Sequence, residues 1–298
     1  MWTRHKMDRE ALADALTRSR VAGHVGTSRS NVLSRMERLI EGHPAERFGL
    51  RLDALSRTEV AAAVRDEAGL GPSAAGEPWV DPGRLCDRLA AAGARLAQAA
   101  NAGERVLFAT GHPVGLLLLY LSVAAALEGA GATVLTPAGG ERWEERPVGS
   151  EPRTPFAVAK RLLKALRAGS AAGSVQRGVA FVGGVGVVTD GRSAYHTHSG
   201  RAMEHMLAEA LPDLVVGDHG LAGTAVAAGI DTIAVADVND PALIVAHRRG
   251  QLRHLLVMDD NSPPNAYRPC FQVLTEGLEE RPATGGSTPR KLSEETGR

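Results

Sequence analysis

After about residue 80, short apolar runs alternate with longer segments of helical pattern. The apolar runs predict strands at 106–109, 133–135, 178–182, 185–188, 214–216, 232–235 and 255–258. Helical patterns cover residues 83–101, 113–129 and 156–168. Continuous apolar strands separated by helices are typical of a mostly parallel sheet that is covered on both faces. The pattern therefore predicts an α/β fold, Rossmann-like, with helices on both faces of the sheet.

The first part of the chain has a different pattern. Between about residues 8 and 70, apolar residues recur at helical spacing, as in Leu12 with Leu16 and Val32 with Met36. We expect residues 1–70 to form a helical N-terminal segment or lid and residues 80–277 to form the catalytic α/β domain. Segments rich in Gly, Pro and polar residues predict a linker at 70–78, a loop at 137–155 and a disordered tail at 278–298.

Composition narrows the possible partners. The 298 residues include 34 basic and 34 acidic side chains, so nothing resembles the basic surface of a nucleic-acid binder or a membrane-surface protein. Its two cysteines, Cys86 and Cys270, lack metal-type spacing, which fits a reducing cytoplasm. The longest apolar run, Val114–Leu127, is too short to span a bilayer, and no secretory signal precedes it. We expect a cytoplasmic protein with a small-molecule substrate; homo-oligomerisation is left open.

A His-x-His pair is the most informative chemical feature. Side chains at i and i+2 of an extended segment leave the same face, so His196 and His198 can chelate one ion. Asp218 and His219 follow directly after an apolar run about twenty residues later. Three imidazoles and a carboxylate are the ligand set of a mononuclear site for a divalent transition metal such as Fe, Zn or Mn. Alternatively, these polar residues only cap the next helix, for which Ser199 is a suitable N-cap.

Polar clusters follow four of the predicted strands. They are Thr110–Pro113, Asp218–His219, Asp237–Pro241 and Asp259–Asn261. Open α/β sheets bind ligands at the carboxyl ends of their strands, so we expect the clusters to converge. Asp240, which precedes Pro241, is most simply a helix N-cap, whereas Asp237 at the strand exit is the better candidate for a site residue.

The turn after the first predicted strand suggests anion binding. Gly111 permits close approach of the backbone, and the free amides of the helix that we expect at Pro113 attract phosphate or carboxylate. The glycines of 182–188 do not form a dinucleotide fingerprint, and the chain has no GxSxG elbow or Walker loop. We therefore expect no nucleotide cofactor.

Taken over most of residues 20–275, the chain resembles an actinobacterial family of phosphatases. The resemblance rests on the segments 108–113, 134–138, 196–199, 212–220, 236–243, 259–260 and 267–269. It implies hydrolysis of a small phosphorylated metabolite. Asn239 stands where the family pattern leads us to expect a third acidic residue.

Two enzymatic interpretations remain open. In the hydrolase, His196, His198 and Asp218, with or without His219, hold a metal that polarises a phosphoryl oxygen and lowers the pKa of the attacking water. The expected catalytic residues are Asp237, Asp259 and His112, and the expected substrate- or anion-binding residues are Thr110, Gly111, His112 and Arg268.

In the alternative, His196, His198 and Asp218 form the facial ligand set of a non-heme iron oxygenase of secondary metabolism. A third interpretation is a small-molecule binding protein whose histidines only hydrogen-bond the ligand. The imidazole-rich set distinguishes the chain from phosphatases that depend on Mg²⁺, whose ligands are normally oxygen atoms.

Overall fold

The computed structural model describes residues 7–68, 78–137, 142–145 and 175–279. Within them, the central sheet has eight strands, and five neighbours run parallel in the order β10, β9, β8, β3 and β7. These are β10 (His254–Val257), β9 (Thr232–Ala236), β8 (Leu214–Asp218), β3 (Arg105–Thr110) and β7 (Val185–Thr189). The antiparallel strands β6 (Val175–Val182) and β5 (Arg142–Glu145) extend one edge, and β4 (Thr133–Val134) pairs with the start of β3.

The predicted α/β fold with a mostly parallel sheet is confirmed. The expectation of a loop throughout 137–155 is wrong, because residues 142–145 form strand β5 and pair with β6. Such a short, polar edge strand has no apolar run that would reveal it in the sequence. The predicted helix at 156–168, residues 70–77 of the predicted linker and residues 280–298 of the predicted tail lie outside the described residues.

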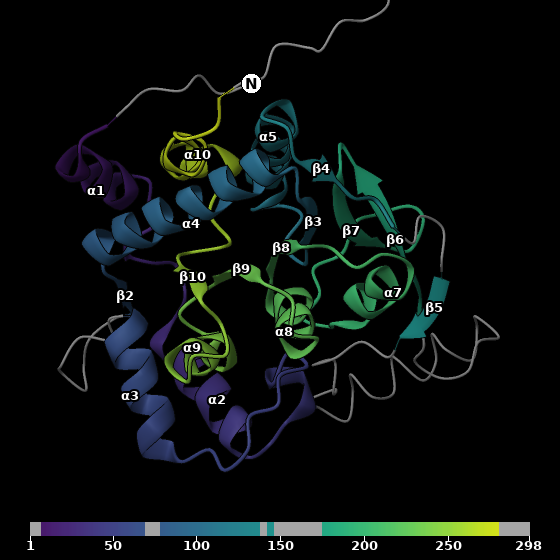
Figure 1. Cartoon of the computed structure of the whole chain (residues 1–298). Helices are drawn as coiled ribbons and strands as arrows, with labels where there is room; N and C mark the ends of the chain where they lie inside the picture. Colours follow the sequence, from purple (N-terminus) through teal and green to yellow (C-terminus); the bar gives the residue numbers. More distant parts are fainter. Residues whose placement is uncertain (1–6, 69–77, 138–141, 146–174, 280–298) are drawn as a thin grey trace, which may run out of the picture.

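Helices cover both faces of the sheet (Figure 1). On one face lie α4 (Pro82–Ala102), α5 (Leu117–Gly129) and α10 (Arg268–Leu274), and on the other α7 (Arg201–Glu209), α8 (His219–Ala227) and α9 (Pro241–Arg248). The N-terminal segment contributes α1 (Arg9–Arg18), which packs on α4, together with α2 (Arg29–Ile40) and α3 (Arg57–Ala68), which pack on α9. Its shorter elements are β1 (Gly23–His24), which pairs with β2 (Trp79–Val80), and the 3-10 turn η1 (Pro44–Glu46); a second 3-10 turn, η2 (Pro264–Tyr267), precedes α10.

Local sequence signals explain where the long helices begin and end. The side chain of Asp81 caps α4 by accepting a hydrogen bond from the amide of Arg84, and Gly103 ends the helix with a left-handed φ of 67°. Helix α5 begins at Leu117 rather than at Pro113, because His112 and Leu116 first close a separate turn. No helix in the described ranges is both long and apolar enough to cross a bilayer.

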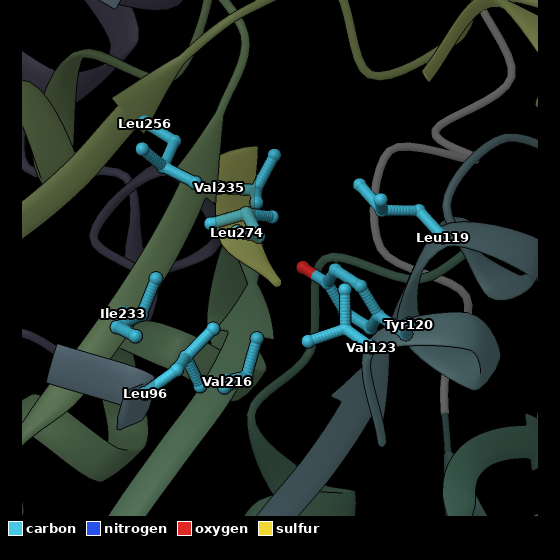
Figure 2. A pocket seen from close by; sticks show the side chains of 9 residues that line it. All are labelled: Leu96, Leu119, Tyr120, Val123, Val216, Ile233, Val235, Leu256 and Leu274. Carbon is cyan, nitrogen blue, oxygen red and sulfur yellow. The ribbon is translucent and has the colours of Figure 1, made fainter. Parts of the chain in front are cut away.

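The N-terminal helices and the sheet share one hydrophobic core. Between the sheet and the layer of α4, α5 and α10, this core contains a small void of about 10 Å³ (Figure 2). Leucine, valine and isoleucine side chains surround it, and the hydroxyl group of Tyr120 points in among them. That hydroxyl has no hydrogen-bond partner in the described part of the chain.

Candidate active site

Four imidazole rings meet at the carboxyl edge of the parallel strands. His112 follows β3, His196 and His198 follow β7, and His219 begins α8 directly after β8. Around the group, neighbouring ring centroids are 4.0, 4.8, 4.2 and 4.3 Å apart, and the two diagonals measure 6.4 and 5.8 Å. These six distances describe a nearly flat, almost square figure, which we call the histidine square. Its members come from three strand ends that the fold brings together.

Two buried carboxylates lie against one side of the histidine square. Nε2 of His219 is 3.0 Å from Oδ2 of Asp240 and 3.2 Å from Oδ2 of Asp260. Nδ1 of His112 is 3.5 Å from the same oxygen of Asp260. The two aspartates follow β9 and β10, so the next two parallel strands complete the site.

The N-cap position expected for Asp240 is confirmed, but its side chain does not cap the helix. Its backbone occupies the N-cap position of α9, with Pro241 next, but its side chain makes no capping hydrogen bond. Instead, Oδ2 accepts a hydrogen bond from the amide of Asp237 (3.0 Å) and faces His219. The Asp-Pro signal correctly marks the start of the helix and says nothing of where the carboxylate points.

Several buried polar atoms of this group lack a hydrogen-bond partner among the described residues. They are Nδ1 of His112 and of His219, Oδ1 of Asp240 and Oδ2 of Asp260. Two combinations bring ligand atoms within 4.8 Å of one another: His112, His196 and His219 form one, and His198, His219 and Asp240 form the other. Imidazole and carboxylate are the donors that divalent transition metals favour, so the group fits such an ion.

Asp218 does not join these groups, contrary to the expectation from the sequence. It is fully buried, and its oxygens accept hydrogen bonds from Thr110 Oγ1 and from the amide of Gly111, both at 2.6 Å. Thr110 Oγ1 in turn accepts a hydrogen bond from the amide of His112 (2.9 Å). Asp218 therefore fixes the backbone turn that carries His112, and the amides expected to bind an anion are already partly used.

The loop of the His-x-His pair packs tightly against two glycines. Thr197 donates its amide to the carbonyl of Gly111 (3.0 Å), and Nε2 of His196 lies 2.9 Å from Nε2 of His198, so both rings point the same way, as expected. A Cβ on Gly111 would overlap the carbonyl oxygen of Thr197, and one on Gly220 would overlap that of His198. Glycine is required at both positions because the two strand-end turns and this loop share the same space.

Ser199, the alternative N-cap residue of the next helix, makes one long hydrogen bond to that helix. The N-cap position of α7 belongs to Gly200, and the hydroxyl of Ser199 accepts a hydrogen bond from the amide of Arg201 at 3.3 Å. Capping by Ser199 and convergence of the two histidines therefore coexist.

Asp237 and Asp259 hold the N-terminal segment rather than facing the histidine square. Asp237 accepts a short hydrogen bond from the hydroxyl of Thr27, and Asp259 accepts one from the amide of Gly26 at 2.7 Å. The second oxygen of each carboxylate accepts a hydrogen bond from a backbone amide of its own loop. Asp260, the neighbour of Asp259, is the carboxylate that reaches the imidazoles, because the chain bends after β10 ends at Val257.

The N-terminal segment supplies two site residues that the sequence did not reveal. The ring of Phe48 lies 5.6 Å from that of His198 and 5.5 Å from that of His219, measured between centroids. Nη2 of Arg35 lies 3.2 Å from Nδ1 and 3.4 Å from Nε2 of His198. Both contacts join residues about 150 or more positions apart, and no local pattern encodes them.

Burial and charge divide the four imidazoles into two kinds. Burial lowers the pKa of His196 to about 4, and it also lowers the pKa values of His112 and His198. Burial opposes protonation of His219 as well, but the carboxylates of Asp240 and Asp260 outweigh it and raise the pKa of His219. Three of the rings are thus held neutral, the form in which imidazole binds metals.

Arg268 is placed at the exposed start of α10. No hydrogen bond or ion pair joins it to the histidine square in the described structure, so its role in anion binding stays a prediction.

The carboxyl group of Asp260 differs from an ordinary aspartate in its acidity. Burial raises the pKa of Asp260 to about 6.

Comparison with known proteins identifies the family of the chain. The model of a family named Phosphatase matches residues 7–159 and 153–279. The chain belongs to this phosphatase family. A member from Streptomyces coelicolor, named Phosphatase SCO2771, is 36% identical over 278 residues, which are 89% of this chain and 94% of that protein. The resemblance to actinobacterial phosphatases is thereby confirmed, and the matched ranges of this family member include all four rings of the histidine square and both adjacent carboxylates.

Proposed function

We propose that the protein is a metal-dependent phosphatase that hydrolyses a small phosphomonoester at the histidine square. The observation that carries the proposal is the convergence of four imidazoles and two buried carboxylates in a chain of the Phosphatase family, with two buried atoms among them, Nδ1 of His219 and Oδ1 of Asp240, that have no partner in the described structure. Buried polar groups are normally hydrogen-bonded, so a cluster of unpaired ones points to a ligand that they hold.

The ligand set that we propose differs from the one expected from the sequence. His112, His196 and His198 hold the ion as neutral imidazoles, together with Asp240, whose Oδ1 is buried and unpartnered. His219 joins them through its unpartnered Nδ1, which gives up its proton when the ion binds, while its Nε2 keeps facing Asp240 and Asp260. A divalent cation bound there supplies Lewis-acid polarisation of a phosphoryl oxygen and lowers the pKa of a bound water.

The side chains around the ion position the substrate and move protons. Asp260, which contacts both His112 and His219, holds these two rings in place and accepts the proton of the attacking water. The water oxygen would bond to phosphorus while the bond from phosphorus to the ester oxygen breaks, and the proton taken up by Asp260 would pass to the leaving oxygen, which gives an alcohol and inorganic phosphate and restores the carboxylate. Phe48 shields the rings from bulk water on the side of the N-terminal segment.

Metal analysis together with phosphate release tests the proposal. We expect about one equivalent of Zn, Mn or Fe in the purified protein and less than half of it in His196→Ala. His43→Ala is the matched control, because His43 is exposed and lies just before η1, apart from the square. Removal of the metal by a chelator should abolish phosphate release from p-nitrophenyl phosphate. Full metal content in His196→Ala, or phosphate release that survives chelation, would contradict the proposal.

The two other interpretations predict different results in the same assays. An iron oxygenase turns over only with oxygen and releases no phosphate, and zinc cannot replace its iron. A binding protein shows neither activity. Asp218, the carboxylate that both enzymatic interpretations assigned to the metal, is engaged by Thr110 and Gly111, so its position does not decide between them. Membership of the Phosphatase family is what favours the hydrolase.

A further inference from the structure

A guanidinium group from the N-terminal segment faces one corner of the histidine square. Arg35 lies on α2, and 22% of its side chain is exposed. Its Nη2 lies 3.2 Å from Nδ1 and 3.4 Å from Nε2 of His198, so the guanidinium contacts this ring. A guanidinium carries five N–H donors, and the contacts with His198 and Glu46 do not use all of them.

The charge of Arg35 is only partly neutralised. Nη1 donates to Oε2 of Glu46 at 2.7 Å, while the other oxygen of the same carboxylate accepts a hydrogen bond from Nε of Arg38 at 2.9 Å. One buried carboxylate thus serves two guanidinium groups, and the trio carries one excess positive charge. Arg38 faces Glu46, and Arg35 is the member that also faces His198.

A positive group beside a cation site calls for an anion between them. The guanidinium of Arg35 contacts the square at His198, where Nη2 lies 3.2 Å from Nδ1. The carboxylates of Asp240 and Asp260 face His219, and Asp260 also faces His112; among the described residues neither carboxylate forms an ion pair with Arg35. Guanidinium binds phosphate through paired N–H donors.

We propose that Arg35 binds the phosphate group of the substrate and of the product, so that the oxyanion lies between the guanidinium of α2 and the ion at the histidine square. The inference rests on the proposed function for its substrate class. It gives the N-terminal segment a direct part in the site, because α2 provides a binding residue. The hydrogen bonds of Gly26 with Asp259 and of Thr27 with Asp237 fix the start of α2 against the strand ends.

The experiment compares two arginines that share one partner. Arg35→Met and Arg38→Met each leave Glu46 with one guanidinium, so neither strands the buried carboxylate. In metal-loaded full-length protein, we measure the affinity for inorganic phosphate by calorimetry and metal content by elemental analysis. We expect Arg35→Met to weaken phosphate binding at least tenfold at unchanged metal content, and Arg38→Met to change it less than threefold. Arg35→Lys, which keeps the charge and loses the paired donors, should fall between.

Equal phosphate affinities in Arg35→Met and Arg38→Met, or no phosphate binding by the unaltered protein, would overturn the inference. If Arg35→Met loses metal or unfolds, the comparison of Arg35→Lys with the unaltered protein decides, and equal affinities there refute it. Phosphate binding that depends on Arg35 in a protein that releases no phosphate from esters would end the proposed function and leave this inference standing. Phosphate release with affinity independent of Arg35 would do the reverse.

Discussion

Two buried tyrosines should respond in opposite directions when their hydroxyl groups are removed. Tyr120 points its hydroxyl into the apolar void of Figure 2 and has no hydrogen-bond partner among the described residues. Tyr267 is equally buried, but its hydroxyl donates to the carbonyl of Asp259 (2.8 Å) and accepts from the amide of Ser262 (3.0 Å). Replacement by phenylalanine keeps each ring and removes only the hydroxyl group, which is unpaired in Tyr120 and makes two hydrogen bonds in Tyr267.

The expected magnitudes follow from the local environments. A buried, unpaired hydroxyl costs about 1–3 kcal/mol. Enlarging the void of Tyr120 by the volume of one oxygen costs roughly 0.3 kcal/mol, at about 24 cal/mol per Å³ of cavity. A water molecule in the void would need two or more polar partners, and the lining offers only the tyrosine hydroxyl. Tyr120→Phe should therefore stabilise the fold by about 1–2 kcal/mol, whereas Tyr267→Phe should destabilise it by about 1–3 kcal/mol.

Urea unfolding followed by circular dichroism measures both changes, provided that the slopes of the transitions match. The melting temperature of Tyr120→Phe should rise by about 2–4 °C per kcal/mol. A loss of stability in Tyr120→Phe similar to that in Tyr267→Phe would refute the reasoning, because it would mean that the Tyr120 hydroxyl has a partner.

Three further predictions concern the site and the thiols. Gly220→Ala should lower both stability and metal content because its new Cβ overlaps the carbonyl of His198, whereas Gly129→Ala, with open space at its Cβ, should be neutral by both measurements. Asp240→Asn should lose more than half of the metal. Asp237→Asn should keep the metal, but its free energy of unfolding should fall by about 1–2 kcal/mol because its hydrogen bond with Thr27 is weakened. Equal metal content in the two variants would contradict this prediction. Cys86 and Cys270 are buried, and burial raises the pKa of Cys270 to about 12, so neither thiol should react with an aromatic disulfide reagent at pH 8 until the protein is unfolded.

The sequence predicted the edge of the sheet that carries the site, and the reason is general. Apolar runs identify buried parallel strands, and the polar residues after them must meet at one edge. His112 and His219 could be selected in this way because each lies just after a strand end, whereas His196 and His198 were selected by their His-x-His spacing. The direction of a side chain beyond the strand was not predictable to the same degree.

The local sequence does not predict which of the aspartates after β9 and β10 face the histidines. Asp237 and Asp240 are three residues apart, and Asp259 and Asp260 are adjacent, yet in each pair one anchors the N-terminal segment and the other faces His219. Which one does so depends on the turn after the strand and on partners more than 200 residues away. Arg35 is a stronger case, because its place beside the histidines follows only from the packing of α2 on α9.

The energetics of the histidine square favour a bound ligand over a purely structural role. His219 holds a left-handed backbone with a φ of 43°, which is strained for a residue with a side chain. Two buried atoms of the same group, Nδ1 of His219 and Oδ1 of Asp240, have neither a hydrogen bond nor an ion pair in the described structure, each at a cost of about 1–3 kcal/mol. Together with the backbone strain these costs are a large fraction of the stability of a typical domain, about 5–15 kcal/mol. An apolar cluster at this edge would fold more stably, so the polar one is best explained by what it binds.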